Sequence, residues 1–213
     1  MDTRIPSEVG GGTPISVETR DTLSGDRGAE PWCDPNASRP VRSEPIYAWP
    51  SLFLANRHGV PLGLARHAID IVKTMAGQKR QPNWTRPDES LLMKEVPRVR
   101  ANIARAEMLL GAARAYTYET LDRLWDELCG ERRVSLETRV AVAASRQNAF
   151  KTGREIAQLM VDTAGSSAIY RTSPLDRLLR DAITMCQHWT AQERTLEMIG
   201  AVALGRQTGR HFV

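Results

Sequence analysis

The sequence has few of the features that stabilise secreted or membrane proteins. It contains only three cysteines in 213 residues, Cys33, Cys129 and Cys186. Because they are odd in number and far apart, they provide neither a disulfide framework nor the spacing of metal ligands, which favours a cytoplasmic protein. No apolar run approaches the roughly 18 residues of a membrane-spanning helix. The first residues lack the apolar stretch of a secretory signal, so we expect no membrane partner.

Long runs of basic residues are also missing, since no run of Lys or Arg exceeds two residues. Residues 1–44 contain five basic and eight acidic side chains, a net charge of −3, and residues 45–213 contain 24 basic and 17 acidic, a net charge of +7. The basic part suits an anionic partner, such as a phosphate-bearing cofactor or a coenzyme A ester. Its arginines are interleaved with acids, which is typical of solvated helix faces, so nucleic-acid binding is not expected.

The composition divides the chain into two parts. In residues 1–44, ten residues are Gly or Pro, including the run Gly10-Gly11-Gly12, and apolar residues are sparse. Such a segment buries too little surface to offset its ordering entropy, so we expect a disordered tail. Residues 45–213 have the composition of a folded domain.

The second part shows helical periodicity almost throughout. Apolar residues recur every three or four positions, which predicts helices over 51–56, 60–78, 89–128, 135–163, 173–189 and 192–204. Pro97 should either kink the third helix or mark its true first turn. No convincing two-residue period indicates a strand. Long helices joined by short loops predict an all-α fold, an antiparallel four-helix bundle.

The most informative stretch begins at Ser173. Its side chain can cap a helix, and Pro174 fits the first helical position. Asp181 and His188 are seven residues apart, so they would share a face of this helix. An imidazole beside a carboxylate is a candidate for acid–base chemistry. The alternative is a partly buried histidine near a structural ion pair.

Three sequence elements occur together in a recognisable order. They are GLARHA at 63–68, TAGSS at 163–167 and PLDRLLRDA at 174–182, with the long proline-containing helix between the first two. In this order they resemble the C-terminal four-helix domain of the acyl-CoA dehydrogenase superfamily, and within it the flavin-dependent monooxygenase branch. The resemblance covers roughly residues 45–213.

The resemblance implies a role for His188. In many dehydrogenases the Arg-Asp-Ala helix leads to a Tyr-Glu-Gly triplet, whose glutamate removes the substrate α-proton. Counted without gaps, the corresponding residues here are His188, Trp189 and Thr190. Tryptophan cannot act as a base, because its indole N–H only donates. The monooxygenase branch instead carries a histidine at this point, thought to assist deprotonation of a phenolic substrate or to stabilise the oxygenated flavin. His188 is thus the implied catalytic residue, with Asp181 or Arg180 orienting the helix end.

The resemblance also implies a flavin cofactor, FAD or FMN, and residues that contact it. In the superfamily a Gly-rich turn approaches the flavin of a neighbouring subunit, which here assigns Gly165 and Ser166 to a flavin phosphate. Lys79 and Arg80 occupy a loop that often reaches the same phosphate. The alternatives are a helix-ending turn at Gly165 and a solvated basic pair. No metal site is implied.

Family members also carry an N-terminal helical domain and a middle β-domain, which build most of the flavin and substrate pocket. Neither is recognisable here. The resemblance therefore implies a flavin-dependent oxidoreductase, most like the oxygenase subunit of a two-component monooxygenase, working with a flavin reductase or a separate flavin-domain subunit. The alternative is a non-catalytic bundle that serves oligomerisation or subunit assembly. An apolar face without its β-domain favours a homo-oligomer, a dimer or a tetramer.

Overall fold

The computed structural model describes residues 42–83, 85–86 and 88–206. The expected disordered tail therefore lies almost wholly outside the described residues. Within them, no helix combines the length and the apolar character needed to cross a bilayer.

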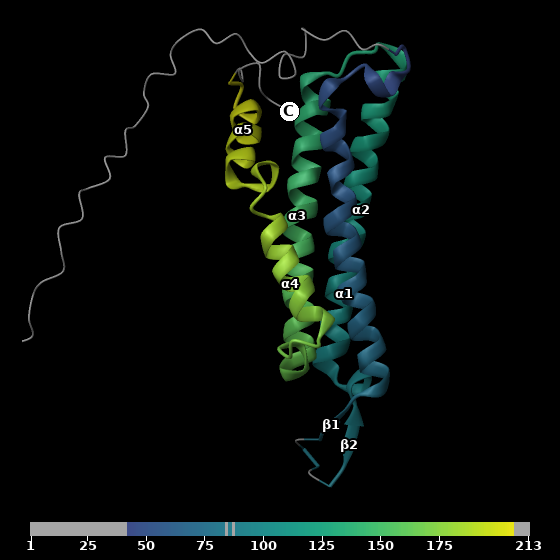
Figure 1. Ribbon diagram of the computed structural model, residues 1–213, viewed down its shortest axis with the longest axis vertical. Coiled ribbons are helices and arrows are strands. Elements are labelled where there is room, and N and C mark those ends of the chain that lie inside the picture. The colour runs from purple at the N-terminus through teal and green to yellow at the C-terminus, as the bar shows by residue number, and fades with distance from the viewer. Residues whose placement is uncertain (1–41, 84, 87, 207–213) are drawn as a thin grey trace, which may run out of the picture. The chain divides into compact units, whose positions relative to one another are not determined.

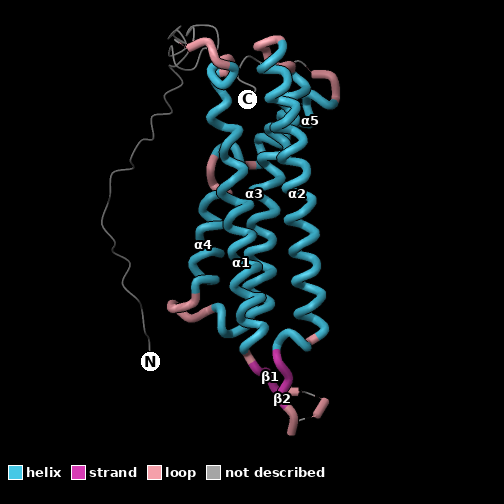
Figure 2. The backbone as a smooth tube through the Cα atoms, turned by 90° about the vertical axis from the view of Figure 1, so that its right-hand side faces the viewer, coloured by secondary structure: helices cyan, strands magenta, loops and turns pink. Residues whose placement is uncertain are grey.

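Helices dominate the described part of the chain. Its α-helices are α1 (Gly59–Gln78), α2 (Pro97–Gly130), α3 (Leu136–Ala164), α4 (Pro174–Met185) and α5 (Glu193–Ala203). Its 3₁₀ helices are η1 (Pro45–Tyr47), η2 (Pro50–His58), η3 (Met93–Glu95), η4 (Gly165–Ala168) and η5 (Trp189–Ala191). Long helices α1, α2 and α3 lie side by side in alternating directions, and α4 and α5 follow one another along α3 (Figures 1 and 2). The predicted all-α antiparallel bundle is confirmed, with the two short helices α4 and α5 in the place of its fourth member.

Helix α3 lies at the centre of the bundle and packs against the other four α-helices (Figure 1). Its consecutive residues Ser145, Arg146 and Gln147 are all buried. Successive side chains of a helix point about 100° apart, so burial of three in a row requires neighbours on more than one side. α3 is therefore the helix against which the other four α-helices are positioned.

The predicted helix starts are largely confirmed. The Ser135 side chain caps α3 by accepting the backbone N–H of Thr138 at 3.1 Å, and Ser173 caps α4 by accepting that of Leu175 at 3.3 Å. Pro97 is the first residue of α2, where its missing N–H costs no hydrogen bond. The helix expected from residue 89 is therefore wrong over its first eight positions.

A small hairpin replaces the start of that expected helix. Strand β1 (Arg80–Pro82) pairs antiparallel with β2 (Ser90–Leu92), with Gln81 opposite Leu91. The expectation of no strand was wrong here, because three-residue strands are too short to show a two-residue period.

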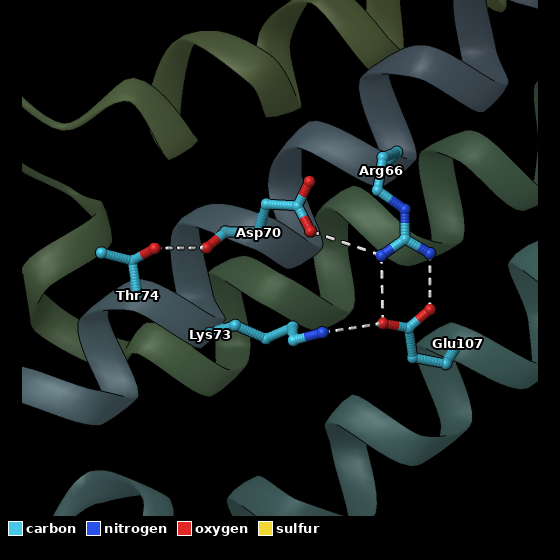
Figure 3. Close-up of polar contacts among 5 residues, drawn as sticks. All are labelled: Arg66, Asp70, Lys73, Thr74 and Glu107. Atoms are coloured by element: carbon cyan, nitrogen blue, oxygen red, sulfur yellow. Dashed lines mark hydrogen bonds and ion pairs between the residues drawn. The ribbon is translucent and has the colours of Figure 1, made fainter.

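Charged side chains join α1 to α2 on the bundle surface (Figure 3). Arg66 donates to both carboxylate oxygens of Glu107, at 3.0 and 2.5 Å, and Lys73 lies 3.4 Å from the same carboxylate. The hydrogen bond from Arg66 lowers the pKa of Glu107 below its usual 4.5. Because both partners are more than a third exposed, water and salt screen the attraction, and the pair contributes about 1 kcal/mol at most.

Replacement of Glu107 by Gln should therefore have a small, pH-dependent effect. The folded-state pKa of Glu107 is depressed, so its contribution is complete above pH 4.5 and is lost as the pH falls through the folded-state value. We expect E107Q to be less stable than the parent by under about 1 kcal/mol at pH 7. The difference should close in acid and in high salt. Urea unfolding at pH 7 and below pH 4 measures it, and a gap that stays constant would contradict the pairing.

At Gly153 of α3, both α1 and α4 come very close to the helix backbone. A Cβ atom placed there would lie 2.9 Å from both Cβ and O of Pro61 in α1, and 3.2 Å from Cε of Met185 in α4. Real Cβ atoms do not come so close to a backbone oxygen. Only glycine lets α1 and the end of α4 both rest on α3 here.

A methyl group at position 153 should separate these helices. We expect G153A to lower the free energy of unfolding by about 1–3 kcal/mol, the usual cost of overpacking. The matched control is G111A on α2, where a Cβ would meet no heavy atom within 4 Å. That change should stabilise the chain by about 0.5–1 kcal/mol through helix propensity. Equal unfolding midpoints in urea for the two variants would refute the close approach.

Candidate active site around His188

His188 lies beyond the end of α4. The helix ends at Met185, and His188 is the residue that precedes η5. Asp181 pairs with Arg177 at 3.7 Å and Arg180 with Asp176 at 3.0 Å, all within α4. The expectation that Asp181 shares a helix face with His188 is wrong, and Asp181 and Arg180, expected to orient the helix end, form their ion pairs within α4. The chain leaves the helix three residues too early for that spacing to hold.

The partners of His188 come from other segments. Nη1 of Arg57, in η2, lies 2.8 Å from Nε2 of His188. A guanidinium only donates, so Nε2 must accept. The neutral ring then carries its proton on Nδ1, which donates to Oγ1 of Thr190 at 2.8 Å. The backbone N–H of Thr190 is more distant from Nδ1, at 3.3 Å, and a protonated nitrogen does not accept from it. These contacts fix one tautomer.

The surroundings of His188 also favour its neutral form. Burial lowers the pKa of the ring below 6.5, and the positive charges of Arg57 and Arg146 lower it further. A neutral imidazole at pH 7 can accept a proton, which suits a general base. Its basic nitrogen is already bound to Arg57, so Arg57 must move before Nε2 can take a proton from another molecule.

Arg146 is the unexpected member of this group. It lies on α3 with 1% of its surface exposed, and its Nε and Nη1 find no hydrogen-bond partner among the described residues. Burial, and then the charge of Arg57, lowers the pKa of Arg146 to about 10, so it is still protonated at pH 7. Sequence reasoning missed both arginines. The available signal was that Arg146 lies three residues after Ala143 and four before Phe150, on the apolar side of its helix.

His58 fixes η2 onto α3 beside this group. It is buried, its Nδ1 donates to the backbone oxygen of Ala55 at 2.6 Å, and its Nε2 accepts from the Ser145 hydroxyl at 2.9 Å. Both ring nitrogens are satisfied, so His58 has a packing role. The contact places the neighbouring Arg57 opposite His188.

The expected phosphate-binding residues lie elsewhere. Lys79 Nζ lies 2.7 Å from Oγ of Ser167 and 3.3 Å from the backbone oxygen of Ala164. Between these residues, Gly165 adopts a positive φ of 61° and Ser166 is exposed. Lys79, which follows α1, thus lies against the turn after α3 that contains Gly165 and Ser166. Arg80 does not join it, because its Nη1 donates to the backbone oxygen of Ser90 at 2.8 Å across the hairpin.

This turn fits one part of a flavin. A lysine ammonium, exposed hydroxyls and an open glycine backbone are suited to a phosphate group. They are not suited to an apolar ring system. The turn is separated from His188 by the twelve residues of α4, which span about 18 Å. The expected site residues of this chain therefore form two places rather than one centre (Figure 1).

Comparison with curated proteins finds related monooxygenases. The indole-3-acetate monooxygenase of Pseudomonas putida is 28% identical over 180 residues, which cover 84% of this chain and 45% of the relative. The chain thus spans less than half the length of this relative.

Comparison with solved structures finds the same fold. XiaF from Streptomyces sp., in complex with FADH2 and glycerol, matches with a TM-score of 0.67 and 16% identity over 87% of this chain and 46% of that one. The complex of TdsC from Paenibacillus sp. A11-2 with FMN and indole matches with a TM-score of 0.66 and 22% identity, over 78% of this chain and 42% of that one.

The family model described as "Acyl-CoA dehydrogenase, C-terminal domain" matches residues 58–193, from the residue after Arg57 to the first residue of α5. The matched region contains α1 to α4, the turn at Gly165 and His188. This chain belongs to the acyl-CoA dehydrogenase C-terminal domain family.

Proposed function

We propose that this chain is the C-terminal helical part of a flavin-dependent monooxygenase, with His188 as its acid–base residue. The observation that carries the proposal is the neutral imidazole of His188, whose Nε2 is a proton acceptor. It stands one residue before Trp189, the position at which many related dehydrogenases keep a glutamate. The similarity to an indole-3-acetate monooxygenase supports the same activity.

In this proposal His188 accepts a proton from the substrate at Nε2, and Thr190 holds the ring through Nδ1. The flavin, FAD or FMN, supplies the oxygen chemistry when it is bound. The substrate class that the relatives suggest is an indole or a related aromatic acid. A flavin reductase provides the reduced cofactor, and the N-terminal and middle domains of the family complete the pocket. The enzyme works in the cytoplasm.

The second part of the proposal concerns Lys79, Gly165 and Ser166. Their turn suits the phosphate of a flavin, but α4 separates it from His188. Both can serve catalysis if the turn reaches the flavin of a neighbouring subunit. The proposal therefore includes a homo-oligomer, a dimer or a tetramer, in which each bundle contributes to two active sites.

A second candidate function is subunit assembly without catalysis. Residues of η1, η2 and α2 line an open apolar hollow, in which Phe53 is 61% exposed and Trp125 is 49% exposed. Exposed aromatic surface of this kind favours contact with another polypeptide. A bundle that only assembles would not need the neutral His188, so turnover separates the two candidates.

The first experiment is the replacement of His188 by Gln. The chain is purified from its own cells with the flavin-domain polypeptide that accompanies it, and supplied with a flavin reductase, NADH, FMN or FAD, oxygen and indole-3-acetate. Loss of the general base should lower kcat by about a hundredfold or more. Product formation is followed by mass spectrometry, and helicity by circular dichroism.

The matched control is H67Q, because His67 is exposed on α1 and should leave turnover unchanged. Unchanged turnover in H188Q would remove His188 from the mechanism. No turnover in the parent complex, or no accompanying flavin-domain polypeptide, would favour the assembly function.

The titration of His188 can be measured without any activity. Its pKa should lie below 6.5 in the parent chain, because burial and two arginine charges oppose protonation. Replacement of Arg57 by Gln removes one of these charges and should move the pKa upward. On acidification, the His188 ring of R57Q would then become protonated, and unable to act as a base, at a higher pH than the ring of the parent. Proton NMR of the His188 ring measures both values, with R105Q on the exposed face of α2 as the control. Equal pKa values in R57Q and the parent would contradict the arrangement.

A further inference from the structure

The guanidinium of Arg146 is buried at a cost in stability. It is 1% exposed, and two of its nitrogens have no partner among the described residues. A buried charge without a partner costs several kcal/mol, so it persists only where something compensates for it. Nothing in the packing of α3 provides that compensation.

The neighbours of Arg146 increase this cost. Arg57 on η2 is close enough for its charge to act on Arg146, and both charges act on His188. None of the ion pairs formed by the described residues includes Arg57 or Arg146. Two cations from separate segments therefore act on one histidine, Arg57 by direct contact and Arg146 through its charge, and no described acidic side chain pairs with either. An anion is the ligand that this arrangement lacks.

We propose that Arg146 and Arg57 bind the carboxylate group of an aromatic substrate and hold its ring beside His188. The inference rests on the proposed function and names the substrate class of the same site, an aryl carboxylate. Each guanidinium is a planar fork of N–H donors that matches a carboxylate. Nε and Nη1 of Arg146 are buried donors without a hydrogen-bond partner among the described residues. A flavin phosphate is a poorer candidate, since its expected donors lie beyond the far end of α4.

The hydrogen bond from Arg57 gives this binding a further consequence. In the free protein Nη1 of Arg57 occupies the lone pair of His188 Nε2 at 2.8 Å. A carboxylate attracts Arg57 more strongly than a neutral imidazole does, because the bond is then between opposite charges. Substrate binding would thus draw Arg57 away and expose Nε2. His188 becomes available as a base only when the anion is present.

The test uses the full chain and needs no turnover. The thermal unfolding of the parent and of R146M is measured at constant ionic strength with rising concentrations of indole-3-acetate, and separately with neutral indole-3-acetamide. We expect R146M to melt at a higher temperature than the parent without ligand, because a buried unpaired charge has been removed. Indole-3-acetate should raise the melting temperature of the parent and not that of R146M. The acetamide should change neither.

The affinity derived from these curves should fall about tenfold to a hundredfold in R146M, the loss expected for a hydrogen bond to a charged group. R146K keeps a positive charge but loses the fork, so it should retain part of the response. The control R105M replaces an exposed arginine of α2 and should respond like the parent. NMR of His188 should show its pKa rising when indole-3-acetate binds the parent, since the anion offsets the charges of Arg57 and Arg146.

Three results would overturn the inference: an R146M response equal to that of the parent, an equal response to the acetamide, or no response of the parent to indole-3-acetate. If R146M instead weakens co-purification of the flavin-domain polypeptide without changing ligand response, the partner of Arg146 is a protein carboxylate, and the inference is also wrong. Because no flavin or turnover enters this test, failure of the monooxygenase proposal would appear only in the His188 assay.

Discussion

The close contact at Gly153 determines the geometry of the candidate site. Pro61 of α1 and Met185 of α4 both rest on this residue of α3, where a side chain would leave no room. Arg57 lies four residues before Pro61, and His188 lies three residues after Met185. The same contact therefore brings together two residues that are 131 positions apart in the chain. The packing of α1 and α4 against α3 therefore positions the polar residues of the site.

The charged groups of the bundle fall into two kinds. Arg66, Lys73 and Glu107 lie on the surface, satisfy one another and are screened by water (Figure 3). Arg146 is buried and incompletely paired. The first kind adds a little stability, and the second lowers it. Groups that reduce stability persist at sites where they serve binding or catalysis. This contrast separates the structural Arg66 of the GLARHA element from Arg146 on α3, for which we propose a role in binding.

The two groups of residues that the family resemblance suggests lie at opposite ends of α4. At its N-terminal end lie the turn at Gly165 and the Lys79 ammonium, which suit a phosphate. Beyond its C-terminal end lies a neutral histidine held by a cation and a hydroxyl. A helix of twelve residues is rigid, so the two places keep a constant separation. Within a single bundle the two places therefore cannot meet, which is why the proposed function assigns them to the active sites of different subunits.

The sequence by itself determined the elements that depend on local interactions. Helical periodicity, the caps at Ser135 and Ser173, and Pro97 and Pro174 at first positions depend on residues within one turn of each other. The order of the three motifs was enough to identify the family. The expectation that Lys79 and the Gly165 turn contact a flavin phosphate also came from local patterns, and it stays a prediction.

Only the tertiary structure decided which residues surround His188. The end of α4 at Met185, the hairpin and the burial of Arg146 depend on contacts between segments distant in the chain. Periodicity shows which face of a helix is apolar, but not which neighbour covers it. Arg57 carries no local signature, and the place of Arg146 on the apolar side of α3 indicates only that it is buried. That the two lie near His188 follows from the packing of η2 and α3. The site consists of residues that helix packing brings close together, and their spacing along the chain does not predict it.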